Sequence, residues 1–109
     1  MNERRIESRY LCADLVRVDW LEGEDGFRTE QAILEDISPA GGCVQLESPV
    51  PLGSTLSISI HDEMFTGYVC YCVYRDYGYF VGVRFSAETV WNRDKVVPDH
   101  LTNLYELAR

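Results

Sequence analysis

Two short groups of residues carry most of the chemistry in this sequence. The first is Arg4-Arg5-Ile6-Glu7-Ser8-Arg9, in which two arginines form an Arg-x-x-x-Arg pattern. The second, some thirty residues later, is Asp36-Ile37-Ser38-Pro39-Ala40-Gly41-Gly42. Guanidinium groups bind phosphate through paired hydrogen bonds, stack on bases and can grip the O6/N7 edge of guanine. The first group therefore predicts contacts with a phosphorylated ligand.

The second group offers complementary chemistry. The carboxylate of Asp36 can accept hydrogen bonds from the N1–H and the exocyclic amine of guanine, which only that base offers as a pair of donors. Ser38 can donate to a phosphate or base oxygen, and Gly41, which has no Cβ, lets a flat ligand or a neighbouring backbone come close. Each group alone is ordinary, because terminal charges are usually solvated and Ser, Pro and Gly are common in loops. Together they indicate a composite site for a guanine nucleotide.

These groups lie before and between predicted strands. Alternating or continuously apolar runs bounded by turn residues predict six strands, over 11–21, 27–36, 42–47, 55–61, 65–74 and 79–85. The apolar phase changes between Leu15 and Val16, which predicts either a bulge or burial on both faces. Short strands joined by hairpin-like turns indicate one all-β domain, an antiparallel barrel or sandwich.

The C-terminal end has a different pattern. Pro98-Asp99 has the composition of a helix start. Apolar residues then follow at helical spacing: Leu101, Leu104, Tyr105 and Ala108. We expect a helix of about ten residues that packs on the barrel, because so short a helix is marginal alone in water. Residues 86–97 are expected to form either a linking helical turn or an irregular cover.

Charge and the distribution of apolar residues limit the possible partners and the location of the protein. The chain has 109 residues, with 10 basic and 18 acidic side chains and a net charge of −8. Such a chain repels a long phosphate backbone, so nucleic acid is not expected as a partner. Residues 1–10 are nevertheless locally basic, with three arginines against two glutamates. No apolar stretch reaches the length of a membrane span, and the first residues lack the apolar block of a signal peptide, so we expect a cytoplasmic protein.

The cysteines and histidines form no recognisable metal or redox motif. None of the four cysteines belongs to a Cys-x-x-Cys pair, and the two histidines are isolated. Cys70 and Cys72 are separated by one residue, so we expect them on one face of a strand as apolar filler. Asp36 and Ser38 have no histidine near them in sequence to complete a nucleophile and base. We therefore expect neither an enzyme nor a cofactor, and thiols kept reduced.

The combination of Arg5-x-x-x-Arg9 with Asp36-x-Ser38-x-x-Gly41 resembles the PilZ domain, a family of bacterial receptor modules for cyclic di-GMP. The strand order, the Pro51-Leu52-Gly53 turn and the Gly82-Val83-Arg84-Phe85 strand end extend the resemblance over most of the chain. It implies a six-stranded antiparallel Greek-key β-barrel with a C-terminal helix over 11–109, preceded by an N-terminal arginine arm over 1–10. It also places the ligand on the outer surface of the barrel.

The resemblance further implies that six residues bind cyclic di-GMP: Arg4, Arg5, Arg9, Asp36, Ser38 and Gly41. The arginine pair would contact phosphate and guanine, the carboxylate would recognise a guanine edge, the serine would bond nearby, and the glycine would permit close approach. A basic residue directly before the arginine motif is similar to what accompanies two intercalated nucleotides rather than one. The number of bound nucleotides stays open.

Two functions are compatible with these patterns. The first is a cyclic di-GMP receptor whose arm, mobile when free, becomes ordered on ligand binding and so signals to a partner protein. The alternative is a protein–protein adaptor of the same fold that works without nucleotide. Its support is the tyrosine-rich segment from Tyr68 to Tyr79, because tyrosine is favoured at interfaces. Dependence of partner binding on the ligand and on Arg5 distinguishes the two.

Overall fold

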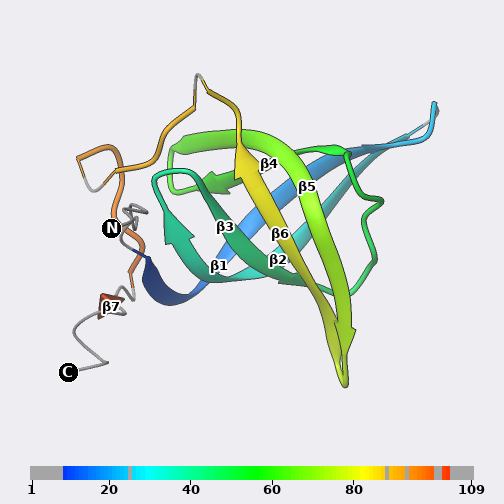
Figure 1. The fold of residues 1–109 in the computed structure, drawn as a ribbon, viewed down its shortest axis with the longest axis horizontal. Helices are drawn as coiled ribbons and strands as arrows, with labels where there is room; N and C mark the ends of the chain where they lie inside the picture. Colours follow the sequence, from blue (N-terminus) through cyan, green and yellow to red (C-terminus); the bar gives the residue numbers. More distant parts are fainter. Residues whose placement is uncertain (1–8, 25, 88, 93, 100–101, 104–109) are drawn as a thin grey trace, which may run out of the picture.

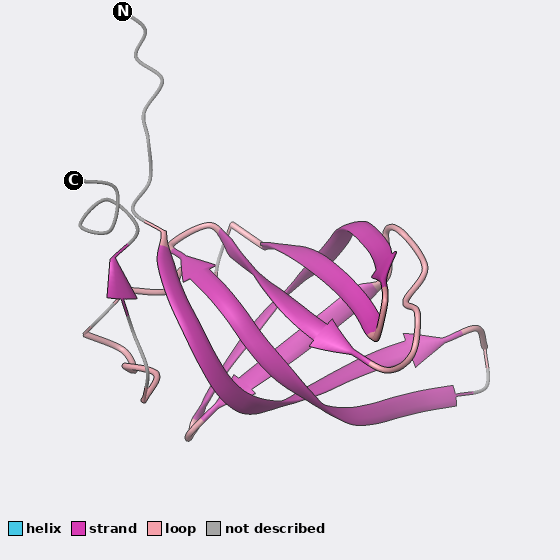
Figure 2. Cartoon of the chain, turned by 90° about the horizontal axis from the view of Figure 1, so that it is seen from below, coloured by secondary structure: helices cyan, strands magenta, loops and turns pink. Residues whose placement is uncertain are grey.

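The computed structural model describes residues 9–24, 26–87, 89–92, 94–99 and 102–103, and the regular structure in this part of the chain is β (Figures 1 and 2). The strands are β1 (Tyr10–Glu22), β2 (Gly26–Ser38), β3 (Gly41–Leu46), β4 (Thr55–Ile60), β5 (Glu63–Arg75), β6 (Gly78–Phe85) and β7 (Thr102–Asn103). The first six coincide closely with the six strands predicted from the sequence, which confirms those predictions.

Strands β1 to β6 form a closed antiparallel barrel. Their order is β2-β3-β6-β5-β4-β1, and β1 pairs with β2 to close the ring (Figure 1). β3 and β4 are consecutive in the chain but are separated in the sheet by β6 and β5, which is a Greek-key connection. All six strands contribute apolar side chains to the core, and Trp20 and Phe65 are among the largest fully buried ones. The predicted six-stranded barrel is confirmed.

The C-terminal segment differs from the prediction. Thr102–Asn103 form β7, which pairs antiparallel with Tyr10 and Leu11 at the start of β1. The helix prediction is therefore wrong for these two residues, because the open edge of β1 supplies backbone hydrogen bonds that a short helix has to form within itself. The other predicted helical residues after Asp99 lie outside the described residues. Within the described ranges no helix is long and apolar enough to cross a membrane.

A bulge in β2 decides which side chains face outward. The pairing of β2 with β3 shifts between Leu34 and Asp36 and leaves Glu35 as an extra residue. Strict alternation after the buried Leu34 would place Asp36 inside the barrel. Because of the extra residue, Ile37 is fully buried instead and Asp36 turns outward. The register of β1 against β2 shifts at the same level, between Leu11 and Asp14. The first strand thus has a bulge, but it lies before the change of apolar phase, where Leu15 is simply exposed and Val16 is buried.

A third bulge lies in β5. Its register against β6 shifts between Val69 and Tyr71, which leaves Cys70 as the extra residue. The thiol of Cys70 is exposed and donates to the carbonyl of Gly82 at 3.4 Å, whereas Cys72 packs against the core. The prediction that both cysteines fill one face is therefore wrong for Cys70, because the extra residue reverses the alternation. Tyr71 consequently faces outward.

Candidate functional site

Two rows of outward-facing residues cross β2, β3, β6 and β5. In the first row each Cα is paired with the next: Asp36, Cys43, Gly82 and Tyr71. The second row is shifted towards the turn between β2 and β3: Ser38, Gly41, Arg84 and Tyr68. Residues two apart on a strand share a face, so both rows look to the same side of the barrel. A hollow on this surface is lined by residues of both rows, among them Asp36, Tyr71, Ser38 and Arg84.

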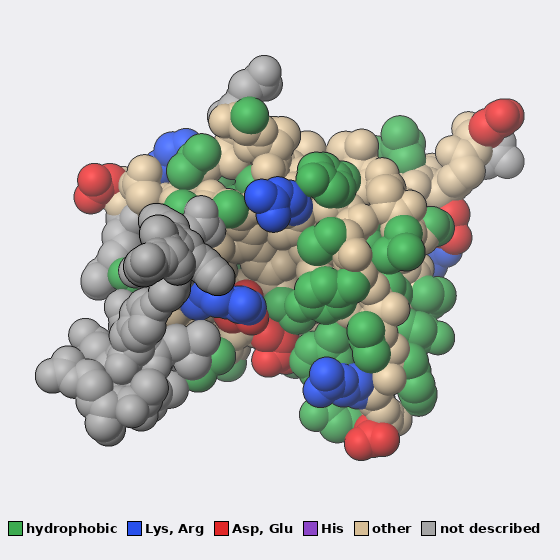
Figure 3. Space-filling view, viewed as in Figure 1, with side chains coloured by type: hydrophobic (Ala, Val, Ile, Leu, Met, Phe, Trp, Pro, Cys, Tyr) green, Lys and Arg blue, Asp and Glu red, His purple; other side chains and the backbone are tan. Residues whose placement is uncertain are grey.

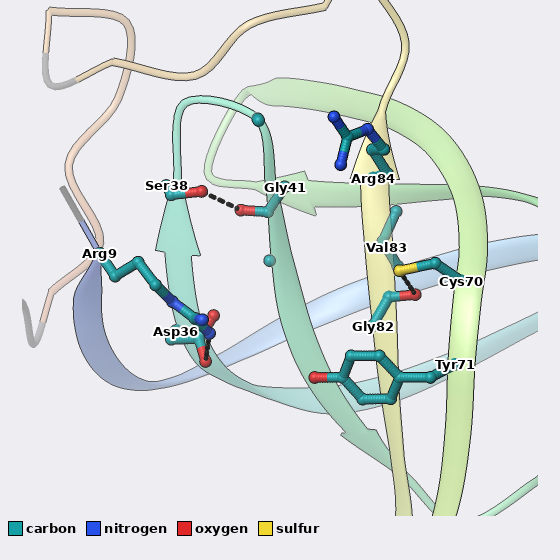
Figure 4. Close-up of a pocket in the computed structure, with 11 residues that line it drawn as sticks. Arg9, Asp36, Ser38, Gly41, Cys70, Tyr71, Gly82, Val83 and Arg84 are labelled. Carbon is teal, nitrogen blue, oxygen red and sulfur yellow. Dashed lines mark hydrogen bonds and ion pairs between the residues drawn. The ribbon is translucent and has the colours of Figure 1, made fainter. Parts of the chain in front are cut away.

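The hollow has a volume of about 510 Å³, within the range of small-molecule sites. Figure 3 shows it as a recess on the face seen in Figure 1, with basic side chains on two sides and hydrophobic side chains over β5 and β6. Arg9 and Asp36 line one side, and Arg84 and Tyr71 project from β6 and β5 on the other (Figure 4). Polar groups from distant parts of the sequence thus converge on one recess.

The two groups singled out in the sequence meet at an ion pair. Arg9 lies directly before β1, whose first residue, Tyr10, is paired with Ile37 of β2. The Nη2 atom of Arg9 donates to Oδ2 of Asp36 at 2.7 Å. The Asp36 side chain is 16% exposed and that of Arg9 is 53% exposed, so the carboxylate is covered by a guanidinium that still faces solvent. This bond uses one of five N–H donors, which leaves Arg9 able to bind a ligand.

Ser38 to Gly41 form the tight turn between β2 and β3. Serine in the first position, Pro39 in the second and glycine in the fourth match the preferences of a type I turn. The buried hydroxyl of Ser38 donates to the carbonyl of Gly41 at 3.3 Å, so its proton is already used within the turn (Figure 4). The predicted donation from Ser38 to a ligand would have to replace this bond.

Gly41 is required by the barrel itself. A Cβ at this position would lie 2.2 Å from the carbonyl oxygen of Val83 on β6. Of the two roles that the sequence suggests for this glycine, close approach of a neighbouring backbone is the one seen here. The structure thus brings Arg9, Asp36, Ser38 and Gly41 together around the recess. Arg4 and Arg5 lie outside the described residues, so their contacts stay predictions.

Two residues that line the recess, Tyr71 and Arg84, belong to neither of the two sequence motifs. The ring of Tyr71 lies across Gly82, where a Cβ would be 2.1 Å from Cε2 of the ring. Arg84 is exposed, and among the described residues its side chain has no ion pair or hydrogen bond. Alternation in the strand end from Gly82 to Phe85 would have placed Arg84 outward. Simple alternation would place Tyr71 on the same face as Val69, which is buried, and this is wrong because the bulge between them leaves no signal in the sequence.

The thiol and the phenol beside the recess stay protonated at neutral pH. Burial raises the pKa of Cys43 to about 11, although a side-chain hydrogen bond with Tyr71 lowers it somewhat. Burial also raises the pKa of Tyr71, and the bond with Cys43 adds to this increase. A protonated thiol is a poor nucleophile. The recess therefore presents guanidinium, carboxylate and aromatic groups suited to binding a ligand.

Replacing Glu35, the extra residue of the β2 bulge, should stabilise the folded protein at neutral pH. Burial and, second, the charge of Asp36 raise its pKa from 4.5. A raised pKa in the folded state contributes stability below pH 4.5 that is lost as the pH rises and the carboxyl ionises. We expect Glu35→Gln to raise the melting temperature at pH 7 by about 1–3 °C.

Thermal unfolding of this variant between pH 4 and pH 7 measures the effect. The gain at pH 7 should shrink as the pH falls, because the wild-type carboxyl is then protonated too. Glu63→Gln, an exposed glutamate at the start of β5, is the control. A gain that grows towards acidic pH would contradict this account of Glu35.

Comparison with known proteins identifies the fold. No family model and no curated protein matches the chain. Among solved structures, the PilZ domain with c-di-GMP of YcgR from Escherichia coli matches with a TM-score of 0.59 and 15% sequence identity. The match covers 80% of this chain and 81% of that chain. The molecule is thus a closed six-stranded barrel with an open recess on its outer face. Its fold is that of a PilZ domain, as the motifs indicated.

The described part of the chain adds two facts on metals and thiols. No group of three or more His, Cys, Asp or Glu residues that could hold a metal ion occurs among the residues described. The four cysteines are free.

Proposed function

We propose that this protein is a receptor module that binds cyclic di-GMP in the recess and passes the bound state to a partner protein. The observation that carries the proposal is the ion pair of Arg9 and Asp36 facing Arg84 and Tyr71 across one recess. The solved structure of similar fold is described with c-di-GMP, which supports the same ligand here.

The chemistry of the recess matches a cyclic dinucleotide with two phosphates and two guanines. Arg9 and Arg84 offer guanidinium groups to phosphate from two sides. Asp36 accepts hydrogen bonds, as the N1–H and amine edge of guanine requires. Tyr71 rests on Gly82 and is 41% exposed, so its open face can stack on a base. Each part of the ligand therefore has a partner of suitable chemistry.

The N-terminal arm is the output in this proposal. Arg4 and Arg5 stand close before Arg9 in the chain, so a ligand held by Arg9 lies within their reach. Contacts from these arginines to the ligand select one geometry of the arm. The partner protein would then recognise the surface formed by the arm and the bound nucleotide together.

Isothermal titration calorimetry with cyclic di-GMP tests the proposal directly. We expect a dissociation constant below about 10 µM, equivalent to about −7 kcal/mol. Cyclic di-AMP is the matched control ligand, because adenine lacks the paired N1–H and amine donors that Asp36 would recognise. Absence of both heat and thermal stabilisation with cyclic di-GMP at about 100 µM would overturn the proposal.

Arg84→Ala tests the part of the site that the motifs did not include. The loss of one partly exposed charge-assisted hydrogen bond should weaken cyclic di-GMP binding about tenfold. Arg75→Ala is the control, since Arg75 lies at the far end of the same hairpin, over the ring of Phe80. Equal affinities for the two variants would remove Arg84 from the proposed site.

One observation favours a second candidate function, that of a protein–protein adaptor that works without nucleotide. Along the β5–β6 hairpin four tyrosines are exposed: Tyr68, Tyr71, Tyr74 and Tyr77. Exposed tyrosines of this density are common in protein interfaces. Partner binding by the wild type and by Arg5→Ala, with and without cyclic di-GMP, separates the functions. Partner binding that changes neither on addition of cyclic di-GMP nor on the Arg5→Ala substitution would favour the adaptor.

A further inference from the structure

The segment after β6 carries a buried tryptophan next to the proposed site. The described residues between 86 and 99 (86–87, 89–92 and 94–99) form no helix and run irregularly at one end of the barrel, so the irregular cover is the alternative that holds there (Figure 1). Trp91 is 1% exposed and belongs to the core cluster. Its Nε1 atom donates to the carbonyl of Val96 at 2.9 Å, which fixes the orientation of the indole.

Trp91 contacts the base of the arginine arm. Its ring meets the ring of Tyr10 edge-on, with centroids 5.6 Å apart and planes at 70°. Tyr10 is the first residue of β1 and directly follows Arg9. The aromatic contact therefore fixes where the strand begins, and so where Arg9 leaves the barrel to meet Asp36.

The same residue holds the other half of the site. The backbone N–H of Trp91 donates to the carbonyl of Pro39 at 3.2 Å, in the turn that follows Asp36. The next carbonyl in this turn, that of Ala40, accepts from Phe85 at 2.7 Å. The cover segment and the end of β6 thus fix both central residues of the turn.

We infer that Trp91 is a positioning residue of the recess, because it joins the arginine arm and the Ser38–Gly41 turn through one buried side chain and its backbone. The inference rests on the proposed function. A ligand that spans Arg9 and the turn binds more tightly when both are already held in place, since less freedom is lost on binding. Trp91 is buried and does not line the recess, so its effect on binding acts through Tyr10 and Pro39.

The second tryptophan provides a matched control. Trp20 is also 1% exposed, but it lies near the other end of β1, paired with Leu56 and Arg28. Trp91→Leu and Trp20→Leu remove the same ring from two equally buried places. We expect both variants to lose thermal stability, while only Trp91→Leu weakens cyclic di-GMP binding, about tenfold relative to Trp20→Leu. Trp91→Phe keeps an aromatic ring against Tyr10 and should restore most of the affinity.

A second variant covers the case in which Trp91→Leu fails to fold. Tyr10→Leu removes the other ring of the pair and should weaken binding similarly, whereas Tyr10→Phe should not. Amide chemical shifts of Ala40 and Gly41 in the ligand-free protein should move in Trp91→Leu and stay in place in Trp20→Leu. If the wild type binds cyclic di-GMP and the Trp91→Leu and Trp20→Leu variants have equal affinities, the inference about Trp91 is overturned but the proposed function is not. Absence of binding by the wild type would overturn the proposed function.

Discussion

Arg9→Ala is expected to weaken cyclic di-GMP binding by about 100-fold, the largest effect of any single substitution in the recess. Charge-assisted hydrogen bonds from a guanidinium to phosphate or to guanine are lost. In addition, the carboxylate of Asp36 loses the guanidinium of Arg9, whose Nη2 atom lies 2.7 Å from Oδ2 of Asp36, so an unpaired negative charge faces the anionic ligand. Asp36→Ala should weaken binding strongly as well, because it removes both the acceptor for guanine and the anchor of Arg9.

Arg17→Ala is a close control for this experiment. Arg17 pairs with Asp19 at 3.1 Å, and the side chains are 57% and 10% exposed, nearly the same as in the pair of Arg9 and Asp36. Arg17 does not line the recess. Calorimetry should therefore show wild-type affinity for Arg17→Ala. An Arg9→Ala protein that binds within a factor of about three of this control would contradict the role of Arg9.

Gly41→Ala is expected to destabilise the barrel by about 2–4 kcal/mol, a fall of about 10–20 °C in melting temperature. The new Cβ would lie 2.2 Å from the carbonyl oxygen of Val83 and 3.3 Å from Cα of Arg84. Both atoms belong to the backbone of β6, so no side-chain rotation can relieve the clash. β3 and β6 must separate, and the floor of the recess is built from these two strands.

Gly26→Ala separates this effect from the general cost of replacing a glycine. At Gly26, the start of β2, a Cβ would meet only the carbonyl oxygen of Glu22, at an ordinary 3.6 Å. Thermal unfolding should show little change in this variant. If Gly41→Ala instead kept the wild-type melting temperature and lost only affinity, Gly41 would serve the ligand rather than the strand pairing.

The net charge of −8 is compatible with an anionic ligand because charge is distributed unevenly over the molecule. Arg9 and Arg84 lie on two sides of the recess, and the nearest carboxylate, Asp36, is covered by Arg9. A small ligand meets mainly these local charges, whereas an extended polyanion also meets the acidic remainder. The site can therefore suit a dinucleotide on a protein that we do not expect to bind nucleic acid.

Much of this protein was predictable from local patterns in the sequence. Alternation of apolar and polar residues located six strands, since a half-buried strand has a period of two residues. Turn residues such as Pro39 and Gly41 located the hairpin between β2 and β3. The pairing of arginines with Asp36 and Ser38 indicated a PilZ-like barrel, and the fold is confirmed. The prediction of a C-terminal helix was wrong at Thr102–Asn103, because these residues pair with the start of β1, which is distant in sequence and leaves no mark in the local pattern.

The sequence by itself thus located the six strands and supplied the motifs that resemble a PilZ domain, together with the residues that we expect to bind a guanine nucleotide. Only the tertiary structure decided which side chains reach the recess, because the bulges at Glu35 and Cys70 depend on how neighbouring strands pair. For the same reason it alone assigned Gly41 to strand packing and placed Trp91 between Tyr10 and Pro39. Contacts between residues distant in sequence follow from closure of the barrel, which no local pattern records.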